Sequence, residues 1–292
     1  MSVTPKRTGA GLAAAIPPAM ARAAAYLRSR QSPSGGYCFY RAMGVEEPNL
    51  HDTYYALAGL HLAGEAPPRD EATRVFLHGF PVSAQVHGLY YHTLALTLLG
   101  EGSPPAAIRR KIAALPIHLP APPVNSSAFQ ALAFTLQLKR KVGTPVDEAA
   151  IIAHLGTLEH PGGGFGAKAN VIDTHWALTA LDACAATAAA SRTRDFLVRV
   201  QNRNFGFVLT VDSVAPTLET LFAGIHACRM LDLQVAHPHA AAGFALACQS
   251  GGGGFARAPM ALPNIELTYQ GLAVLAALGS VLQKRTNDDG RG

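Results

Sequence analysis

Charged residues are scarce in this sequence. Asp, Glu, Lys and Arg make up 15% of the 292 residues, against about a quarter in a typical soluble domain, whereas hydrophobic residues make up 49%. The net charge is +5, yet the basic residues are dispersed, and the runs at 109–111 and 139–141 each adjoin a helical pattern. Short basic runs of this kind are typical of solvated helix ends. We therefore expect one domain with a large apolar core and no nucleic-acid partner.

Cysteine is also rare. The four cysteines, Cys38, Cys184, Cys228 and Cys248, are scattered, and no two of them form a Cys-x-x-Cys pair. Such spacing argues against a disulfide framework and favours cysteines that fill small spaces in a core. A reducing compartment suits this pattern, and we expect a cytoplasmic protein.

Long uninterrupted apolar runs are missing as well. No run approaches the ~20 apolar residues that cross a bilayer, so no transmembrane segment is expected. Residues 9–25 resemble a signal peptide only faintly, because Pro17 and Pro18 interrupt the apolar stretch and Arg22 follows closely. We expect residues 1–16 to form a flexible leader, residues 17–282 a single domain and the polar residues 283–292 a disordered tail.

The sequence has little strand-type alternation and is instead dominated by a repeated unit. The unit contains a glycine-aromatic turn, a loop with a basic residue, and Asn at the start of an apolar helix. It occurs at residues 31–62, 162–184 and 248–278. Self-similarity with a period of about forty residues is the signature of a repeat architecture.

The rest of the chain keeps the same rhythm of helix, Pro-bearing loop and helix, which gives six helix pairs in all. The second helix of each pair is the more apolar and aromatic, and these helices are predicted to begin near His51, Gly88, Asn125, Asp173, Glu219 and Glu266. Six hairpins of equal length can close into an all-α (α/α)6 toroid whose second helices line an apolar cavity. An open superhelix of HEAT type is the alternative, although its repeats usually lack a glycine-aromatic turn.

The repeated unit resembles the prenyltransferase/squalene-cyclase repeat. The resemblance is carried by Gln-x-x-x-Gly-Gly-aromatic, a loop, an acidic residue and a Thr/Tyr-rich apolar helix, and it covers about residues 22–282. The family includes protein prenyltransferase β subunits, squalene–hopene cyclases and class II diterpene cyclases, and it implies a toroid around a central isoprenoid cavity. The repeat is more specific for this fold than for one reaction.

The cyclases of this family carry Asp-x-Asp-Asp-Thr-Ala at the start of an inner helix, and its middle Asp donates a proton. Residues 49–54 and 170–175 resemble this motif, but His51 and Ile172 occupy the donor position. In the fifth and sixth repeats that position holds Glu219 and Glu266. The resemblance therefore implies a set of candidate catalytic residues spread over several repeats: Glu266, Asp52, Asp173, His51 and Glu219.

Both structural and catalytic roles fit these acids. Asp52 and Asp173 stand where a side chain caps a helix N-terminus, as do the Asn residues three positions earlier. Glu266 lies one turn into an apolar helix, where a desolvated carboxyl would have a raised pKa and could act as the proton donor. The alternative for Glu266 is an exposed first-turn residue that faces the helix dipole.

The protein prenyltransferases hold zinc with Asp-x-Cys and a His from neighbouring inner helices. Here Asn264-x-Glu266 and His51 occupy those positions, and no Cys stands at an inner-helix start. Asn is a poor zinc ligand, so the resemblance implies no metal site. In that family an Arg after the glycine-aromatic turn binds diphosphate. The resemblance therefore implies an anion pocket at Arg257, Lys168 and Arg41, which follow the corresponding turns here. With a diphosphate substrate it also implies Mg²⁺.

Aromatic side chains of the inner helices complete the predicted site. They could stabilise carbocations through their π faces, or they could simply pack in the core. The predicted substrate-binding residues of this kind are Tyr54, Tyr91, His175, Trp176, Phe222 and Tyr269. The favoured function is acid-initiated, class II-type cyclisation of an isoprenoid small molecule. The alternatives are prenyl transfer from a prenyl diphosphate, which in a protein prenyltransferase requires a partner α subunit, and a non-catalytic toroid that binds a lipid or a protein.

Overall fold

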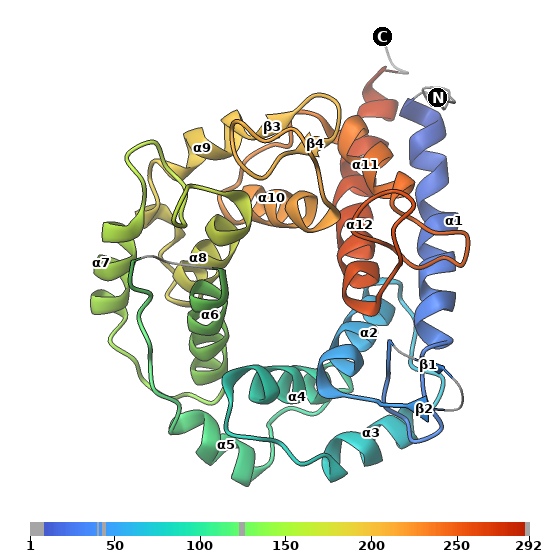
Figure 1. Cartoon of the computed structure of the whole chain (residues 1–292), viewed down its shortest axis with the longest axis vertical. Coiled ribbons are helices and arrows are strands. Elements are labelled where there is room, and N and C mark those ends of the chain that lie inside the picture. The colour runs from blue at the N-terminus through green and yellow to red at the C-terminus, as the bar shows by residue number, and fades with distance from the viewer. Residues whose placement is uncertain (1–8, 40, 43–44, 123–125, 290–292) are drawn as a thin grey trace.

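A computed structural model describes residues 9–39, 41–42, 45–122 and 126–289, which contain twelve α-helices and two small hairpins. The helices alternate between an outer and an inner ring (Figure 1). The outer helices are α1 (Gly9–Arg28), α3 (Asp70–Gly79), α5 (Ala106–Ala113), α7 (Glu148–Leu158), α9 (Thr193–Arg199) and α11 (Pro238–Ala247). The inner helices are α2 (Leu50–Leu62), α4 (Val86–Leu98), α6 (Ser126–Lys141), α8 (Val171–Ala183), α10 (Leu218–Met230) and α12 (Ile265–Asp289).

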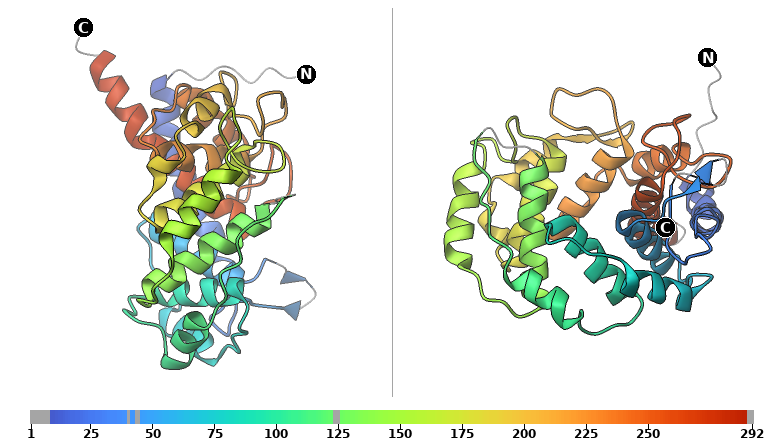
Figure 2. Two further views of the ribbon diagram at one scale, coloured as in Figure 1. Left: turned by 90° about the vertical axis from the view of Figure 1, so that its left-hand side faces the viewer. Right: turned by 60° about the horizontal axis from the view of Figure 1, so that its bottom comes forward.

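The inner ring is closed. Each inner helix contacts the next, and α12 returns to contact α2 (Figure 1). The predicted toroid is therefore confirmed and the open superhelix is excluded. Two antiparallel hairpins of two-residue strands lie in the connections between helices: β1 (Arg41–Ala42) pairs with β2 (Val45–Glu46) between α1 and α2, and β3 (Gln201–Asn202) with β4 (Gly206–Phe207) between α9 and α10. The first of them stands out from the ring (Figure 2).

The two rings differ in how much of each helix is buried. The outer helix α5 buries only Ile108 and Ile112, which lie one turn apart on a single stripe. The inner helix α8 instead buries nine of its residues, from Val171 to Leu181. A helix that is covered on nearly all sides must be apolar nearly all round, which is the pattern that the sequence shows for the second helix of each pair.

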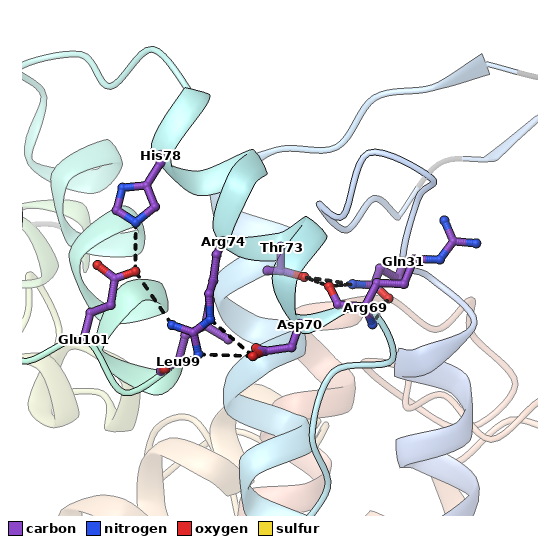
Figure 3. Close-up of polar contacts among 8 residues, drawn as sticks. All are labelled: Gln31, Arg69, Asp70, Thr73, Arg74, His78, Leu99 and Glu101. Carbon is purple, nitrogen blue, oxygen red and sulfur yellow. Dashed lines mark hydrogen bonds and ion pairs between the residues drawn. The ribbon is translucent and has the colours of Figure 1, made fainter.

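The glutamine of the repeated motif joins one repeat to the next outer helix. Gln31 donates from Nε2 to the Thr73 hydroxyl (2.8 Å), and its Oε1 accepts the backbone N–H of Arg69 (3.1 Å), so it holds the start of α3 (Figure 3). Beyond it, Arg74 pairs with Asp70 (3.1 Å) and with the backbone oxygen at the end of α4 (Figure 3). Gln249 repeats the arrangement at the end of the chain, donating to the backbone oxygen of Ala19 in α1 (2.8 Å).

The first glycine of each Gly-Gly pair permits a close backbone approach to the next repeat. Gly35, Gly163 and Gly253 all have positive φ angles, of 94°, 81° and 92°. A Cβ atom on Gly253 would lie 2.4 Å from the carbonyl oxygen of Arg22 in α1. Only glycine fits such a position without strain. Gly253 and Gln249 therefore close the ring between the sixth repeat and the first.

The Asn and Thr residues of the repeat serve the turn and the helix start. Asn49, Asn170 and Asn264 cap α2, α8 and α12 by accepting a backbone N–H three residues later, at 2.7–2.9 Å. Thr53, Thr174 and Thr268 each accept, at 3.0 Å, the backbone N–H of the buried turn aromatic, which is Tyr37, Phe165 or Phe255. Much of the repeated sequence is thus explained by folding.

The two ends of the domain differ from the prediction. Helix α1 begins at Gly9, so residues 9–16 are not a leader; Leu12 and Ile16 are buried, and this burial extends the helix beyond Pro17. Helix α12 continues to Asp289 rather than ending at Leu282, through residues such as Gln, Lys and Arg that favour helix. These two helices pack together, with the start of α1 and the end of α12 on the same side of the ring (Figures 1 and 2).

The predicted inner-helix starts agree with the observed ones to within two residues for five helices, and Asn125 lies outside the described residues. The segment Ile265–Leu282 of α12 is long and apolar enough to cross a membrane by composition alone, contrary to the prediction that no such run exists. Of this segment, 61% is buried, and α12 contacts α1, α2, α10 and α11. Its apolar character is that of a core helix.

Candidate active site at the inner ring

His51 connects two carboxylates at the start of α2 and α12. Its Nδ1 lies 3.3 Å from Asp52 Oδ1, and its Nε2 lies 3.3 Å from Glu266 Oε2. Burial alone would lower the pKa of His51, but the hydrogen bonds to Asp52 and Glu266 outweigh burial and raise the pKa to about 9. An imidazole between two carboxylates donates from both nitrogens, so His51 is a cation at neutral pH.

Asp52 is fixed by the loop that precedes α2. Its Oδ2 accepts the backbone N–H of Phe39 (2.8 Å) and the Asn49 side-chain amide (3.0 Å). Burial would raise the pKa of Asp52, yet the hydrogen bonds from His51, Phe39 and Asn49 together lower it. Asp52 therefore remains a carboxylate and keeps His51 protonated.

Glu266 has a different environment from the apolar one predicted for it. Its side chain is 34% exposed, faces His51, and accepts a hydrogen bond from Gln270 Nε2 (3.3 Å). A cation hydrogen-bonded to a carboxyl group stabilises the carboxylate that remains after a proton is given away. In the series Asp52–His51–Glu266, called the rim triad below, the carboxylate form of Glu266 helps to keep His51 charged. When Glu266 takes up a proton, the neighbouring cation favours the release of that proton.

Seven rings one turn further along the inner helices form a closed series, called the aromatic belt. All six inner helices contribute, and neighbouring ring centroids lie 4.8–5.9 Å apart. In order round the ring, the belt is Tyr55, Tyr91, Phe134, Trp176, His175, Phe222 and Tyr269. His51 touches it, with its ring 4.8 Å from that of Tyr55 and 5.0 Å from that of Tyr91.

The belt contains most of the predicted aromatic residues and two that were not among the predicted site residues, Tyr55 and Phe134. Tyr54, also predicted, packs on the belt at 4.9 Å from Tyr55. Burial raises the pKa of Tyr54, Tyr55, Tyr269 and Tyr91, the last to about 12. The phenols are therefore neutral, and their electron-rich faces can stabilise a carbocation.

A pocket of about 820 Å³ continues from the belt toward the C-terminal ends of α10 and α12. Its wall runs along α12 from Tyr269 past Ala273 and Ala277, and along α10 from His226 to Arg229. Pockets for small ligands have volumes of about 300–1,000 Å³. Alanines on α12 leave room for a hydrocarbon chain, while Arg229 and Asp232 add charged groups to the wall.

The predicted diphosphate patch is not assembled among the described side chains. Lys168 pairs with Asp212 at 2.6 Å, and both are largely exposed. Arg257 pairs through Nε with Glu219 at 2.8 Å. Arg41 lies in β1, and its side chain is outside the described part of the chain. Lys168 and Arg257, the two cations of this predicted patch whose side chains are described, thus each have a carboxylate partner, and Glu219 contacts Arg257 rather than the rim triad.

Asp173 connects two inner helices. It is buried, and its carboxylate accepts hydrogen bonds from the Asn170 amide (2.7 Å) and from the Ser126 hydroxyl at the start of α6. These partners belong to its own cap and to the neighbouring inner helix. These contacts support a structural role for Asp173, in which it holds the capping Asn170 and connects α8 with α6, although it accepts no backbone N–H among the contacts that the structure describes.

The residues at the zinc position do not fit zinc. Asn264 Oδ1 accepts the backbone N–H of Leu267 at 2.7 Å, and Glu266 faces the cationic His51. Across residues 9–39, 41–42, 45–122 and 126–289, no group of three or more His, Cys, Asp and Glu side chains is placed to hold a metal ion.

The charge on His51 makes stability depend on pH. Its folded-state pKa of about 9 lies above the ordinary 6.5, so its protonation stabilises the fold fully below pH 6.5, and this contribution is lost as the pH rises through 9. We expect urea titrations of the wild type and of His51→Gln to show that the free energy of unfolding of the wild type, relative to that of the variant, decreases as the pH is raised from 6.5 to 9. The effect is modest because the side chain is 40% exposed. A pH-independent difference would mean that His51 is neutral in the fold.

Comparison with known proteins identifies the family. Residues 16–78 and 125–290 match the family described as Prenyltransferase alpha-alpha toroid domain. Because the match covers more than half of the chain, the protein belongs to this family. The unmatched residues 79–124 contain α4 and α5, where the sequence lacks the double glycine.

Two solved structures share the fold at low sequence identity. A type II terpene cyclase, MstE from Scytonema, in complex with its substrate geranylgeranyl dihydroxybenzoate, has a TM-score of 0.57 at 12% identity, over 93% of this chain and 98% of that chain. A protein from Actinoplanes has a TM-score of 0.54 at 16% identity, over 90% and 99% of the two chains. No curated protein sequence matches the chain. At these identities the likeness concerns the fold alone.

Proposed function

We propose that the protein is an isoprenoid-handling enzyme of the acid-initiated, terpene cyclase type, with Glu266 as the proton donor. The observation that carries the proposal is the rim triad, in which Asp52 keeps His51 charged and His51 faces Glu266 at 3.3 Å. The contact of His51 with the aromatic belt supports the proposal further, because it places the partner of the proposed acid next to rings that stabilise positive charge.

In the proposed reaction, Glu266 transfers its proton to one carbon of a trisubstituted double bond of the substrate. The π electrons of that bond form the new C–H bond, and the positive charge develops on the more substituted carbon. Neighbouring double bonds then attack this carbon and form rings, while the aromatic belt stabilises the migrating charge. The carboxylate left on Glu266 is stabilised by His51, and its partial exposure allows it to regain a proton from water.

Prenyl transfer from a diphosphate receives less support. That reaction needs cations free to bind the leaving group, whereas Lys168 and Arg257 are paired with Asp212 and Glu219. The pocket beyond the belt, whose wall includes Arg229, has room for the hydrocarbon part of a substrate in either reaction.

Product analysis tests the proposal. We expect the purified protein, incubated separately with geranylgeranyl dihydroxybenzoate, geranylgeranyl diphosphate and an epoxidised triterpene, to convert at least one of them into cyclic isomers of unchanged mass, detected by mass spectrometry and NMR. Released diphosphate together with a prenylated acceptor would instead identify a transferase. Binding of these compounds without any conversion would establish a non-catalytic toroid.

A further inference from the structure

His175 is a buried histidine in the aromatic belt that the proton transfer from Glu266 does not use. It is 7% exposed, its Nδ1 has no hydrogen-bond partner, and its ring lies 4.8 Å from Trp176 and 5.6 Å from Phe222. A buried polar atom without a partner is costly and is expected to have a role. Burial, followed by the nearby His226, lowers the pKa of His175 to about 3, so the imidazole is neutral and carries a lone pair.

A second buried histidine shows that position, and not burial alone, sets His175 apart. His92 in α4 is 3% exposed and also has an unpaired Nδ1, but its Nε2 bonds to the backbone oxygen of Leu77 in the outer helix α3, at 3.0 Å. His92 therefore lies between the two rings of helices. His175 instead contacts side chains of the belt on α8 and α10.

The position of His175 relative to the rim triad is specific. In the closed order of inner helices, α8 is three places from α2 in either direction, so it stands opposite the helix that carries His51 and Asp52 (Figure 1). His175 is also next to His226, at 5.8 Å between ring centroids, and His226 lines the 820 Å³ pocket. Glu266 lies on α12, next to α2 and two places from α8, so the acid and the neutral base stand on different walls of the ring. His226 lies between the base and the pocket.

We propose that His175 is the base that ends the reaction, by taking a proton from the carbon next to the final carbocation; the nature of that cation rests on the proposed function. The lone pair of the imidazole forms the new N–H bond, the C–H bond breaks, and its electron pair becomes the double bond of the product. The imidazolium then passes its proton by way of His226, which lines the pocket, to water, while Glu266 regains one from solvent. Protons and electrons balance, and the net reaction is an isomerisation.

The test uses two cationic isoprenoids that differ by one hydrogen-bond donor. N,N-dimethylgeranylgeranylamine is protonated at pH 7 and offers an N–H, whereas its quaternary trimethylammonium counterpart has the same charge and no N–H. Fluorescence of Trp176, the single tryptophan of the chain, reports binding, because its ring lies 4.8 Å from that of His175. We expect the wild type to bind the dimethyl compound about tenfold more tightly or better, since hydrogen bonds to charged groups contribute about 1.5–3 kcal/mol.

An isosteric pair of variants assigns that preference. His175→Met has no strong acceptor and should lose the preference for the dimethyl compound. His175→Gln has a side chain similar in shape to that of Met but with an acceptor oxygen, and should keep most of the preference. His92→Met is the matched control and should leave the preference unchanged.

In product analysis, His175→Met should shift the product from the wild-type alkene to alcohols formed when water captures the cation, and to other alkenes. If the Met variant does not fold, NMR of the wild type provides the test instead. The ¹⁵N chemical shifts of the His175 ring must then change when the dimethyl compound binds and stay unchanged when the trimethyl compound binds.

The outcomes separate this inference from the proposed function. If the wild type prefers the dimethyl compound through His175 yet converts no isoprenoid, the acceptor site stands and the cyclase proposal fails. If the wild type cyclises a substrate but shows no preference between the two ammonium compounds, or keeps both its preference and its product in His175→Met, the role of His175 is refuted.

Discussion

Replacing Glu266 by Gln should lower turnover by about 10²–10⁴, the usual contribution of a general acid. The substitution keeps the shape of the side chain and removes its proton. Binding of substrate to the belt and pocket does not depend on that proton, so the dissociation constant from Trp176 fluorescence should change little. Steady-state product formation on the substrate identified by product analysis, together with fluorescence titration, measures the two effects separately.

Glu219→Gln is the matched control, because Glu219 occupies the equivalent position of the fifth repeat but pairs with Arg257. It should retain most of the activity. If Glu266→Gln were as active as the wild type while Asp52→Asn were inactive, the proton donor would belong to the first repeat. If neither variant changed turnover, the rim triad would have no catalytic role.

The largest expected effect on stability is that of Gly253→Ala. The added Cβ would lie 2.4 Å from the carbonyl oxygen of Arg22, which belongs to the backbone of α1 and cannot turn aside. The positive φ of 92° adds conformational strain for any residue with a Cβ. We expect a loss of about 3 kcal/mol or more in the free energy of unfolding, and a fall of roughly 6–12 °C in melting temperature.

Gly251→Ala provides the comparison, since nothing lies within 4 Å of a Cβ at Gly251 and it lies in the same turn. Chemical denaturation of the two variants should show a nearly unchanged midpoint for Gly251→Ala and a clearly lower one for Gly253→Ala. Equal midpoints would refute the view that Gly253 closes the ring through contact with α1.

The toroid could be predicted because its signals are local and repeated. Turn glycines, capping Asn residues and apolar helices recur at fixed spacing, and each one acts within a single repeat or on the next. The extent of α1 was not predictable in this way. Leu12 and Ile16 are buried by the fold, and Pro17 gave a stronger local signal for a helix start than those two residues gave against it.

The candidate site was predicted as single residues and not as an arrangement. His51 and Glu266 were both selected from their motif positions, but their contact depends on α12 returning to α2, which only the closed ring provides. Asp173 was selected by the same motif logic, and its carboxylate instead connects Ser126 and Asn170. The belt residue Phe134 lies on α6, whose repeat lacks the double glycine as the repeat of α4 does, so no motif position showed which aromatic residue of α6 faces the belt.

Closure of the ring also constrains how the chain can fold during synthesis. The bond between Gln249 and Ala19 joins residues that are 230 positions apart, and Gly253 meets Arg22 over a similar separation. At about 5–20 residues per second, the ribosome delivers the sixth repeat roughly ten seconds or more after the first. During that interval the first helix pair can make its contacts with α4 but lacks its partners in α11 and α12. An incomplete toroid therefore exposes apolar surface at its open end until the last repeat arrives.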